Sequence, residues 1–254
     1  MSIGRILNTA FGAIFGNLSV MLAIGFLFGG VPRGVAAYFR QGALPALNSS
    51  HSSPAGFVWI VLTGMLVTML FGVIAQGALV RATVDASQGE KVRFGACLAA
   101  AFQRLFPLIG LGLVSGVAFV LAAILLIVPA IILATVWYVA VPVVVAERSG
   151  VFAALGRSAD LTKGDRWAIF AVLLITLGFL LVMFLLSSVI SGIGIAISAR
   201  SGDFSGLPVL TTIAAVIGST LQTVLTGAIS TAVYVELRTL KEGPESQALD
   251  AVFA

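Results

Sequence analysis

Six apolar stretches alternate with charged connectors along this chain, and this alternation constrains the fold more than any other feature of the sequence. The stretches run over residues 18–38, 56–80, 107–127, 130–146, 167–199 and 209–234. A helix needs about 20 predominantly apolar residues to cross the hydrocarbon core of a bilayer. The sequence therefore predicts an all-α fold, an integral membrane bundle of six transmembrane helices that forms a single domain over residues 1–254.

Composition excludes a water-soluble domain. Hydrophobic residues make up 59% of the 254 residues and charged residues only 9%, whereas soluble domains carry about 25% charged residues. The net charge of +4 is spread over short connectors without a Lys/Arg tract, so it favours contact with anionic lipid headgroups over nucleic acid. The N-terminal apolar region is too long for a cleaved signal peptide, and we expect a retained first helix.

Two amphipathic segments are predicted to lie at the membrane interface as short helices. Residues 3–16 and 92–106 both place apolar side chains at helical spacing opposite polar ones. Cys97 falls on the apolar face of the second segment, where we interpret it as a small buried hydrophobe rather than a reactive thiol.

Charge asymmetry predicts the topology. One side of a six-span arrangement carries Arg5, Arg81, Lys91, Arg93, Arg104, Arg148, Arg157, Lys163, Arg166, Arg238 and Lys241, and the other carries Arg33, Arg40 and Arg200. By the positive-inside rule, both termini, the connectors 81–106 and 147–166, and the tail 235–254 are expected in the cytoplasm.

The connector 147–166, which we call the elbow, holds the densest cluster of charges. A short helix is expected here, with Val151, Phe152, Ala154, Leu155 and Leu161 on its apolar side. Arg157, Ser158 and Lys163 would face water or lipid phosphate, Asp165 would cap the next span, and Trp167 would anchor it at the interface. The elbow is either a structural connection or a face that binds a partner or phosphate.

Several features inside the spans predict details of packing. Gly25 and Gly29 would let another helix approach closely, Pro142 should kink the fourth span near Trp137, and the long fifth span should tilt or bend near residues 191–194. The sixth span carries a stripe of polar side chains at helical spacing, namely Thr212, Ser219, Gln222, Thr223, Thr226 and Ser230. These groups form hydrogen bonds between helices or line a polar path.

No residue set specifies a reaction. The single histidine, His51, lies in a predicted loop over residues 40–54 with no carboxylate nearby to orient it, and neither GxSxG nor HExxH occurs. One cysteine and one histidine do not suffice for a structural zinc site, so we predict no catalytic residues, no metal and no cofactor. No charged residue is assigned to the middle of the bilayer, which argues against proton coupling.

Four segments together resemble a known family. They are WYVAVPVVVAERSGVFAALGRSADLTKGDRWAIF (137–170), QGALVRATVDASQGEKV (76–92), LLIVPAIIL (125–133) and YVELRTLKEG (234–243). The chain is similar in these segments to polytopic bacterial membrane proteins of the glycerophosphoryl diester phosphodiesterase membrane-domain type. The resemblance implies a six-span module in the bacterial inner membrane, connected with envelope lipids. The phosphodiesterase activity itself belongs to a separate soluble domain with metal-binding residues that this chain lacks.

The residues carried over from this resemblance are expected on or near the cytoplasmic face. They are Pro142, Glu147, Arg157, Ser158, Leu161, Thr162 and Gly164 in or beside the elbow, and Tyr234, Leu237, Arg238, Glu242 and Gly243 in the tail motif. We expect elbow and tail motif to pack together, with Glu147 or Glu236 pairing with Arg157 or Arg238.

Two functions fit these observations. The first is a non-enzymatic multi-pass membrane protein that binds membrane lipids, or another membrane or cytoplasmic protein, through its cytoplasmic face. The alternative is a transporter or permease-like protein for a small or lipidic solute, which the predicted kink and the polar stripe favour.

Overall fold

The protein is built almost entirely of helices. The computed structural model describes residues 1–46, 54–201 and 207–253; 90% of it is helical, and these ranges contain no β-strand. The helices are α1 (Ile3–Gly16), α2 (Leu18–Ile24), the π-helix η1 (Gly25–Gly30), α3 (Val31–Ala46), α4 (Pro54–Ser87), α5 (Phe94–Gln103), α6 (Leu105–Leu125), α7 (Ile127–Val136), α8 (Ala140–Ala146), α9 (Val151–Thr162), α10 (Arg166–Ser201) and α11 (Leu207–Phe253).

Six helical segments of the described chain are long and apolar enough to cross a membrane. They cover Leu18–Arg40, Val58–Ser87, Leu105–Ile124, Val128–Ala146, Arg166–Arg200 and Pro208–Gly243, one for each predicted span. Their outer surfaces expose many large apolar side chains, such as Leu66, Leu121 and Phe184. Such surfaces suit lipid rather than water, and the predicted all-α membrane bundle is confirmed.

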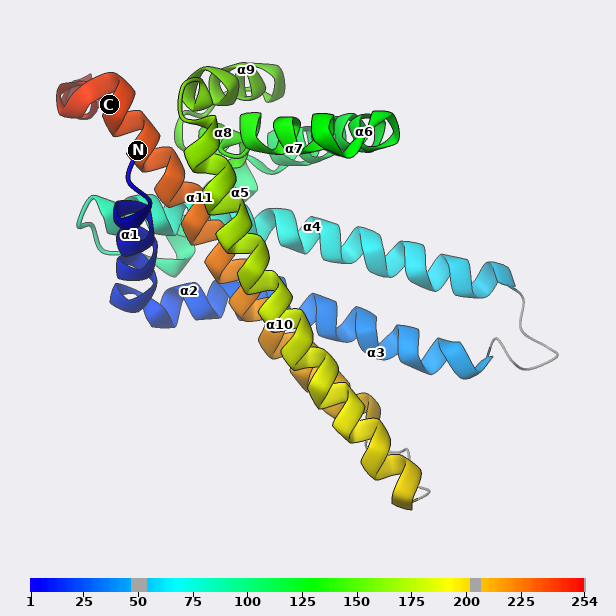
Figure 1. Ribbon diagram of the computed structural model, residues 1–254. Coiled ribbons are helices and arrows are strands. Elements are labelled where there is room, and N and C mark those ends of the chain that lie inside the picture. Colours follow the sequence, from blue (N-terminus) through cyan, green and yellow to red (C-terminus); the bar gives the residue numbers. More distant parts are fainter. Residues whose placement is uncertain (47–53, 202–206, 254) are drawn as a thin grey trace.

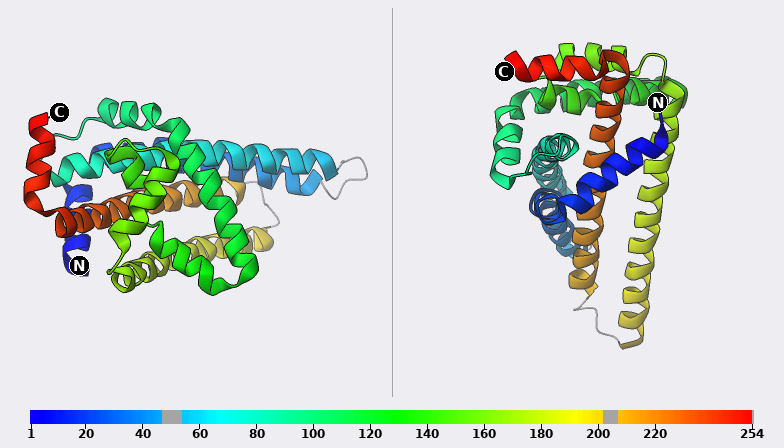
Figure 2. Two further views of the ribbon diagram at one scale, coloured as in Figure 1. Left: turned by 90° about the horizontal axis from the view of Figure 1, so that it is seen from above. Right: turned by 90° about the vertical axis from the view of Figure 1, so that its left-hand side faces the viewer.

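Three helical hairpins extend from one end of the molecule (Figure 1). They pair α3 with α4, α6 with α7, and α10 with α11. The further views show that the α10/α11 hairpin diverges from α3/α4 (Figure 2). Helices α1, α5, α8 and α9 gather where the hairpins meet, and much of the charge lies there: Arg5, Arg93, Arg104, Arg157, Arg238 and Lys241. We call this the charged end and the opposite side the hairpin tips.

Helix α11 is the central element, because it contacts α1, η1, α3, α4 and α10. The approach of η1 to α11 is so close that only glycine fits. A Cβ atom on Gly25 would lie 2.5 Å from Cγ2 of Val224, and one on Gly29 would lie 2.5 Å from Oγ1 of Thr223. The predicted close approach at these two glycines is confirmed, and the partner helix belongs to the same chain.

The fourth span is interrupted as its proline predicts. Helix α7 ends at Val136 and α8 begins at Ala140, so the break immediately precedes Pro142. Proline lacks the N–H that would bond to the carbonyl of Tyr138, four residues earlier, and its ring clashes with that carbonyl. The break is therefore the predicted kink, displaced toward the N-terminal side of Pro142 where proline disrupts a helix.

Several predicted boundaries are wrong because helices continue beyond the apolar stretches. Helix α3 runs to Ala46, so residues 40–46 are helical and not part of a loop. Helix α4 continues seven residues past the predicted end at Val80. Helix α10 runs continuously from Arg166 to Ser201, and the predicted tilt or bend near residues 191–194 stays a prediction. His51 lies outside the described residues.

The predicted amphipathic helices are confirmed at α1 and α5. Helix α1 buries Ile6, Ala10 and Ile14, mainly against α11. Helix α5 packs on α4 and buries Cys97 completely. Burial raises the pKa of the Cys97 thiol to about 11, so almost no thiolate forms near neutral pH. Cys97 is thus the buried hydrophobe that the sequence indicates.

Candidate functional site

The elbow and the tail motif meet in one network of charges at the charged end, which we call the elbow–tail cluster: Glu147, Arg157, Tyr234, Arg238 and Glu242. Arg157 Nε donates to Glu147 at 3.1 Å, and the guanidinium also pairs with Glu242. Arg238 Nε lies 2.9 Å from Glu242, and the Tyr234 hydroxyl donates to Glu147 at 3.1 Å. The predicted packing of elbow on tail and the predicted Glu147–Arg157 pair are confirmed.

Ser158 and Thr162 support the helix break instead of facing solvent. Both side chains are fully buried, and both hydroxyls donate to the carbonyl of Val136, at 2.8 and 3.3 Å. That carbonyl belongs to the last residue of α7, and it receives no hydrogen bond from a backbone N–H of a following helical turn. The expectation that Ser158 faces water or phosphate is wrong, because the break creates a buried acceptor that needs a donor.

Other predicted residues of the elbow and tail also have structural partners. Glu236 pairs with Arg5 of α1 at 2.9 Å, so Glu147 is the acid of the two expected alternatives that pairs with Arg157. Gly164 and Gly243 have φ angles of 97° and 74°, which favour glycine, at the turn before α10 and at a kink in α11. Lys163 is exposed, and its carbonyl accepts from Lys241 Nζ at 2.8 Å. The polar groups of the cluster thus hold α8, α9 and α11 together.

A cation that we assigned to the outside lies within the membrane-spanning part. Arg33 falls inside the first span, Leu18–Arg40, and its Nη1 donates to Thr223 Oγ1 at 3.1 Å. Thr223 lies about 22 Å along its helix from Pro208, at 1.5 Å per residue, and far from the other end of that span. Arg33 therefore lies inside a candidate span, beside the middle of the α11 span, and not at the edge where we expected it from the sequence.

Within the part of the chain that the structure describes, the guanidinium of Arg33 has no carboxylate partner. Among the described residues, its hydrogen bond to Thr223 is the one polar contact the structure gives it, and it belongs to none of the ion pairs. The side chain is only partly buried, because it borders two cavities. An arginine carries five N–H donors in a planar fork, and the hydrogen bond to Thr223 uses one of them.

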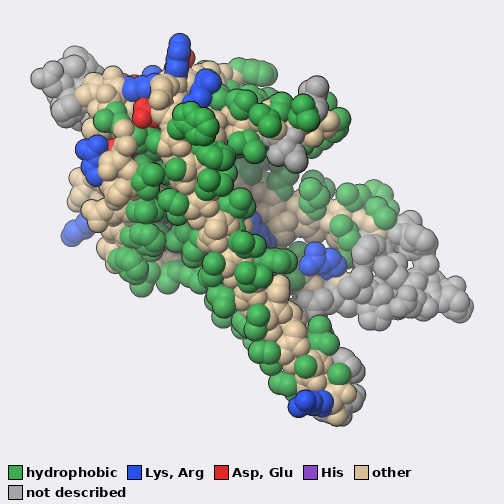
Figure 3. Space-filling view, viewed as in Figure 1, with side chains coloured by type: hydrophobic (Ala, Val, Ile, Leu, Met, Phe, Trp, Pro, Cys, Tyr) green, Lys and Arg blue, Asp and Glu red, His purple; other side chains and the backbone are tan. Residues whose placement is uncertain are grey.

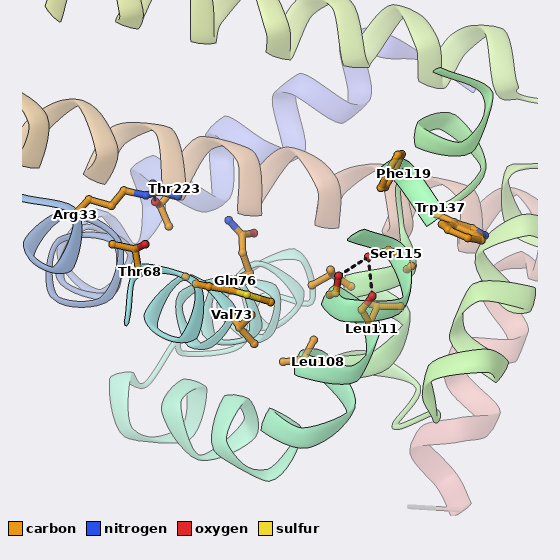
Figure 4. Close-up of a pocket in the computed structure, with 15 residues that line it drawn as sticks. Arg33, Thr68, Val73, Gln76, Leu108, Leu111, Ser115, Phe119, Trp137 and Thr223 are labelled. Atoms are coloured by element: carbon orange, nitrogen blue, oxygen red, sulfur yellow. Dashed lines mark hydrogen bonds between the residues drawn. The ribbon is translucent and has the colours of Figure 1, made fainter. Parts of the chain in front are cut away.

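The first cavity, which we call the inner cavity, has a volume of about 410 Å³. Arg33, Thr68 and Thr223 lie at one of its ends, while Ser115, Phe119 and Trp137 lie at the other (Figure 4). Side chains of α4, α6 and the segment around the break form most of the wall between them. It is an apolar chamber with polar groups at both ends, which is a common design for a ligand site.

The second cavity, which we call the outer cavity, has a volume of about 730 Å³ and lies between α3, α4, α10 and α11. It shares Arg33 and Thr68 with the inner cavity and adds a second cation, Arg40, two turns further along α3. Ser187 and Gln222 also line it. The space-filling view shows basic side chains in the hollow between the hairpins, away from the charged end (Figure 3).

Some residues of the polar stripe on the sixth span form hydrogen bonds between helices, and others line the outer cavity. Thr226 accepts from Nε2 of Gln76 at 3.3 Å and Thr223 accepts from Arg33, so these two residues bond between helices. Ser219 and Gln222 line the outer cavity. The Thr212 hydroxyl is buried and has no hydrogen-bond partner in the structure, and Ser230 bonds within its own helix.

Comparison with known proteins adds no assignment to this geometry: no protein-family model, no curated protein and no solved structure matches the chain. Within the described residues, no three His, Cys, Asp or Glu side chains are grouped so that they could hold a metal ion. The charged group that the two cavities offer to a ligand is a cation, Arg33. Arg33 presents free N–H donors to a space of ligand size, with hydroxyl and amide groups around it.

Proposed function

We propose that this protein is a non-enzymatic multi-pass membrane protein that binds an anionic group inside the membrane, at Arg33. The anionic group is a phosphate or carboxylate, carried either by a lipid headgroup or by a small solute. The observation that carries the proposal is the guanidinium of Arg33, which lies within the spans without a carboxylate partner in the described chain and borders two cavities.

The energetic argument supports a ligand. An arginine at the centre of a transmembrane helix costs roughly 2.5–3.5 kcal/mol on insertion scales, and such residues usually have a functional role. Hydration within the cavities and the hydrogen bond to Thr223 offset part of this cost. An oxyanion would offset more, because charge-assisted, bidentate bonds to phosphate or carboxylate are the strongest that arginine makes.

The elbow–tail cluster is a weaker candidate for ligand binding. Arg157 pairs with two glutamates and Arg238 with one of them, so these cations are neutralised within the chain. This supports the structural interpretation of the elbow and moves the proposed lipid site from the cytoplasmic face into the membrane. With Arg33 in the spans, Arg40 and Arg200 are the described cations near the hairpin tips, so the positive-inside rule favours a cytoplasmic charged end.

We further propose a relation to the glycerophosphoryl diester phosphodiesterase membrane-domain type and a place in the bacterial inner membrane. Support comes from the elbow and the tail motif, two of the four similar segments, which are joined by the elbow–tail cluster. A connection with envelope lipids also agrees with a site for an anionic headgroup.

Native mass spectrometry tests the proposed site on protein purified in a zwitterionic detergent. We expect a short-chain phosphatidylglycerol to bind at least tenfold more tightly than the matching phosphatidylcholine, because only the former has a net negative headgroup for Arg33. A parallel arm with inorganic phosphate tests a soluble source of the same anion. Arg33→Gln should remove the preference and Arg200→Gln, which removes an exposed cation at the end of α10, should keep it. Equal binding by wild type and Arg33→Gln in both arms would contradict the proposal.

A further inference from the structure

The two cavities follow one another along a single face of α4. The outer cavity is lined by Val61, Met65 and Thr68, and the inner cavity by Thr68, Gly72 and Gln76. These residues recur every three or four positions, so they lie on one side of the helix over about 22 Å. Thr68 is the point at which one cavity ends and the next begins.

Arg33 of α3 lies where the two cavities meet, across from Thr68 of α4. It borders both cavities, and its bond to Thr223 links α3 to α11 at this level. The outer cavity leads toward the hairpin tips, because it includes Arg40 and Ile60 near the outer ends of α3 and α4. The inner cavity leads toward the charged end, because it includes Gln76 of α4 and Leu108 at the start of α6.

We propose that the two cavities are the two halves of one route for an anionic headgroup across the membrane, with Arg33, Thr68 and Thr223 as its constriction. This inference rests on the proposed function and adds movement to binding. The anion reaches Arg40 first, exchanges onto Arg33, and passes Thr68 into the inner cavity, while the apolar chamber disfavours hydrated cations. The substrate class is the one proposed above, a phosphate or carboxylate that gives a lipid headgroup or a small solute a net negative charge.

The polar groups along the route are spaced so that an anion can pass from one to the next, instead of surrounding it at one position. Arg33 and Arg40 lie seven residues apart on one face of α3. An anion that moves from one to the other travels about 10 Å and stays near a positive charge throughout. Beyond Arg33, the side-chain amide of Gln76 has a second N–H besides the one that donates to Thr226, and it is a weaker partner that releases an anion easily. The Ser115 hydroxyl donates to the carbonyl of Leu111 and so offers no donor to an anion. A π-helix, η1, immediately precedes α3, and such segments are frequent at functional sites.

Gly72 allows binding and movement to be measured separately. A Cβ built on this residue meets nothing within 4 Å, and the residue faces the inner cavity. Gly72→Leu should therefore narrow the inner cavity, with room for its Cβ, and leave Arg33 and the outer cavity intact. Gly116→Leu is the matched control, because Gly116 is also unobstructed, lies in the α6 span and lines neither cavity.

The experiment uses full-length protein in phosphatidylcholine liposomes that contain acyl-labelled phosphatidylglycerol or acyl-labelled phosphatidylcholine, with dithionite bleaching to follow transfer between leaflets. A parallel arm follows efflux of entrapped glycerol phosphate, to distinguish a lipid from a soluble anion. We expect wild type and Gly116→Leu to move one anionic probe at least tenfold faster than empty liposomes. Gly72→Leu should slow this movement at least tenfold while native mass spectrometry still finds Arg33-dependent binding.

Two results would overturn the inference alone, and a third would overturn it together with the proposed function. Movement by Gly72→Leu at the wild-type rate would show that the inner cavity is not on the route. Arg33-dependent binding without movement by wild type would show a static binding site, which leaves the proposed function standing. Absence of Arg33-dependent binding would instead remove the proposed function together with the inference.

Discussion

Arg33→Met is expected to make the protein more stable while it abolishes binding of the anionic ligand. Methionine matches the aliphatic stem of arginine and has no charge, so the substitution removes the cation from the spans and keeps the packing of the stem. Allowing for the lost bond to Thr223 and for water in the cavities, we expect about 1–3 kcal/mol of stabilisation. Binding sites often show such an inverse relation between stability and function.

The measurement is thermal unfolding in one detergent, compared with Arg200→Met. Arg200 is exposed at the end of the α10 span, so its replacement should leave the unfolding midpoint nearly unchanged. If Arg33→Met instead unfolds at a lower temperature than wild type, the arginine has a structural role that its single hydrogen bond does not explain.

Gly30→Leu is expected to prevent folding. A Cβ on Gly30 would lie 2.9 Å from the backbone carbonyl oxygen of Val216, and backbone in the middle of a helix cannot give way as a side chain can. Separating η1 from α11 would also move Thr223 away from Arg33. Overpacking of this kind costs about 3 kcal/mol or more, which is a large part of the stability of a typical domain.

The yield of monodisperse protein after size-exclusion chromatography measures this effect. Gly178→Leu is the control, because Gly178 lies in the α10 span and a Cβ there meets nothing within 4 Å. A normal yield of Gly30→Leu would show that α11 and η1 are not in contact in the folded protein.

Features that depend on local composition could be predicted from the sequence. Six spans follow from apolar length, the break before Pro142 follows from proline geometry, and α1 follows from apolar periodicity. The Glu147–Arg157 pair was one of the alternatives that could be offered from the sequence, because both residues belong to the elbow.

Features that depend on helix packing could not be predicted in the same way. The pairing of Glu236 with Arg5 requires α1 to lie on α11, which no local pattern reveals. The buried hydroxyl of Ser158 donates to the carbonyl of Val136, which lacks a helical partner because the fourth span is broken there. Arg33 was misplaced because a charge near the end of an apolar stretch resembles a span boundary, whereas the helix continues to Ala46.

The central claim, an anion site at Arg33 inside the membrane, is tested most directly by photocrosslinking in cells. A benzophenone amino acid at Met69, which lines the inner cavity, should capture an anionic lipid or phosphate ester far above its share of the membrane. The same probe at Leu181, an exposed residue of α10, should capture lipids in proportion to membrane composition. We expect Arg33→Gln to abolish the enrichment at Met69. Capture at Met69 that matches capture at Leu181, with or without Arg33, would contradict the account.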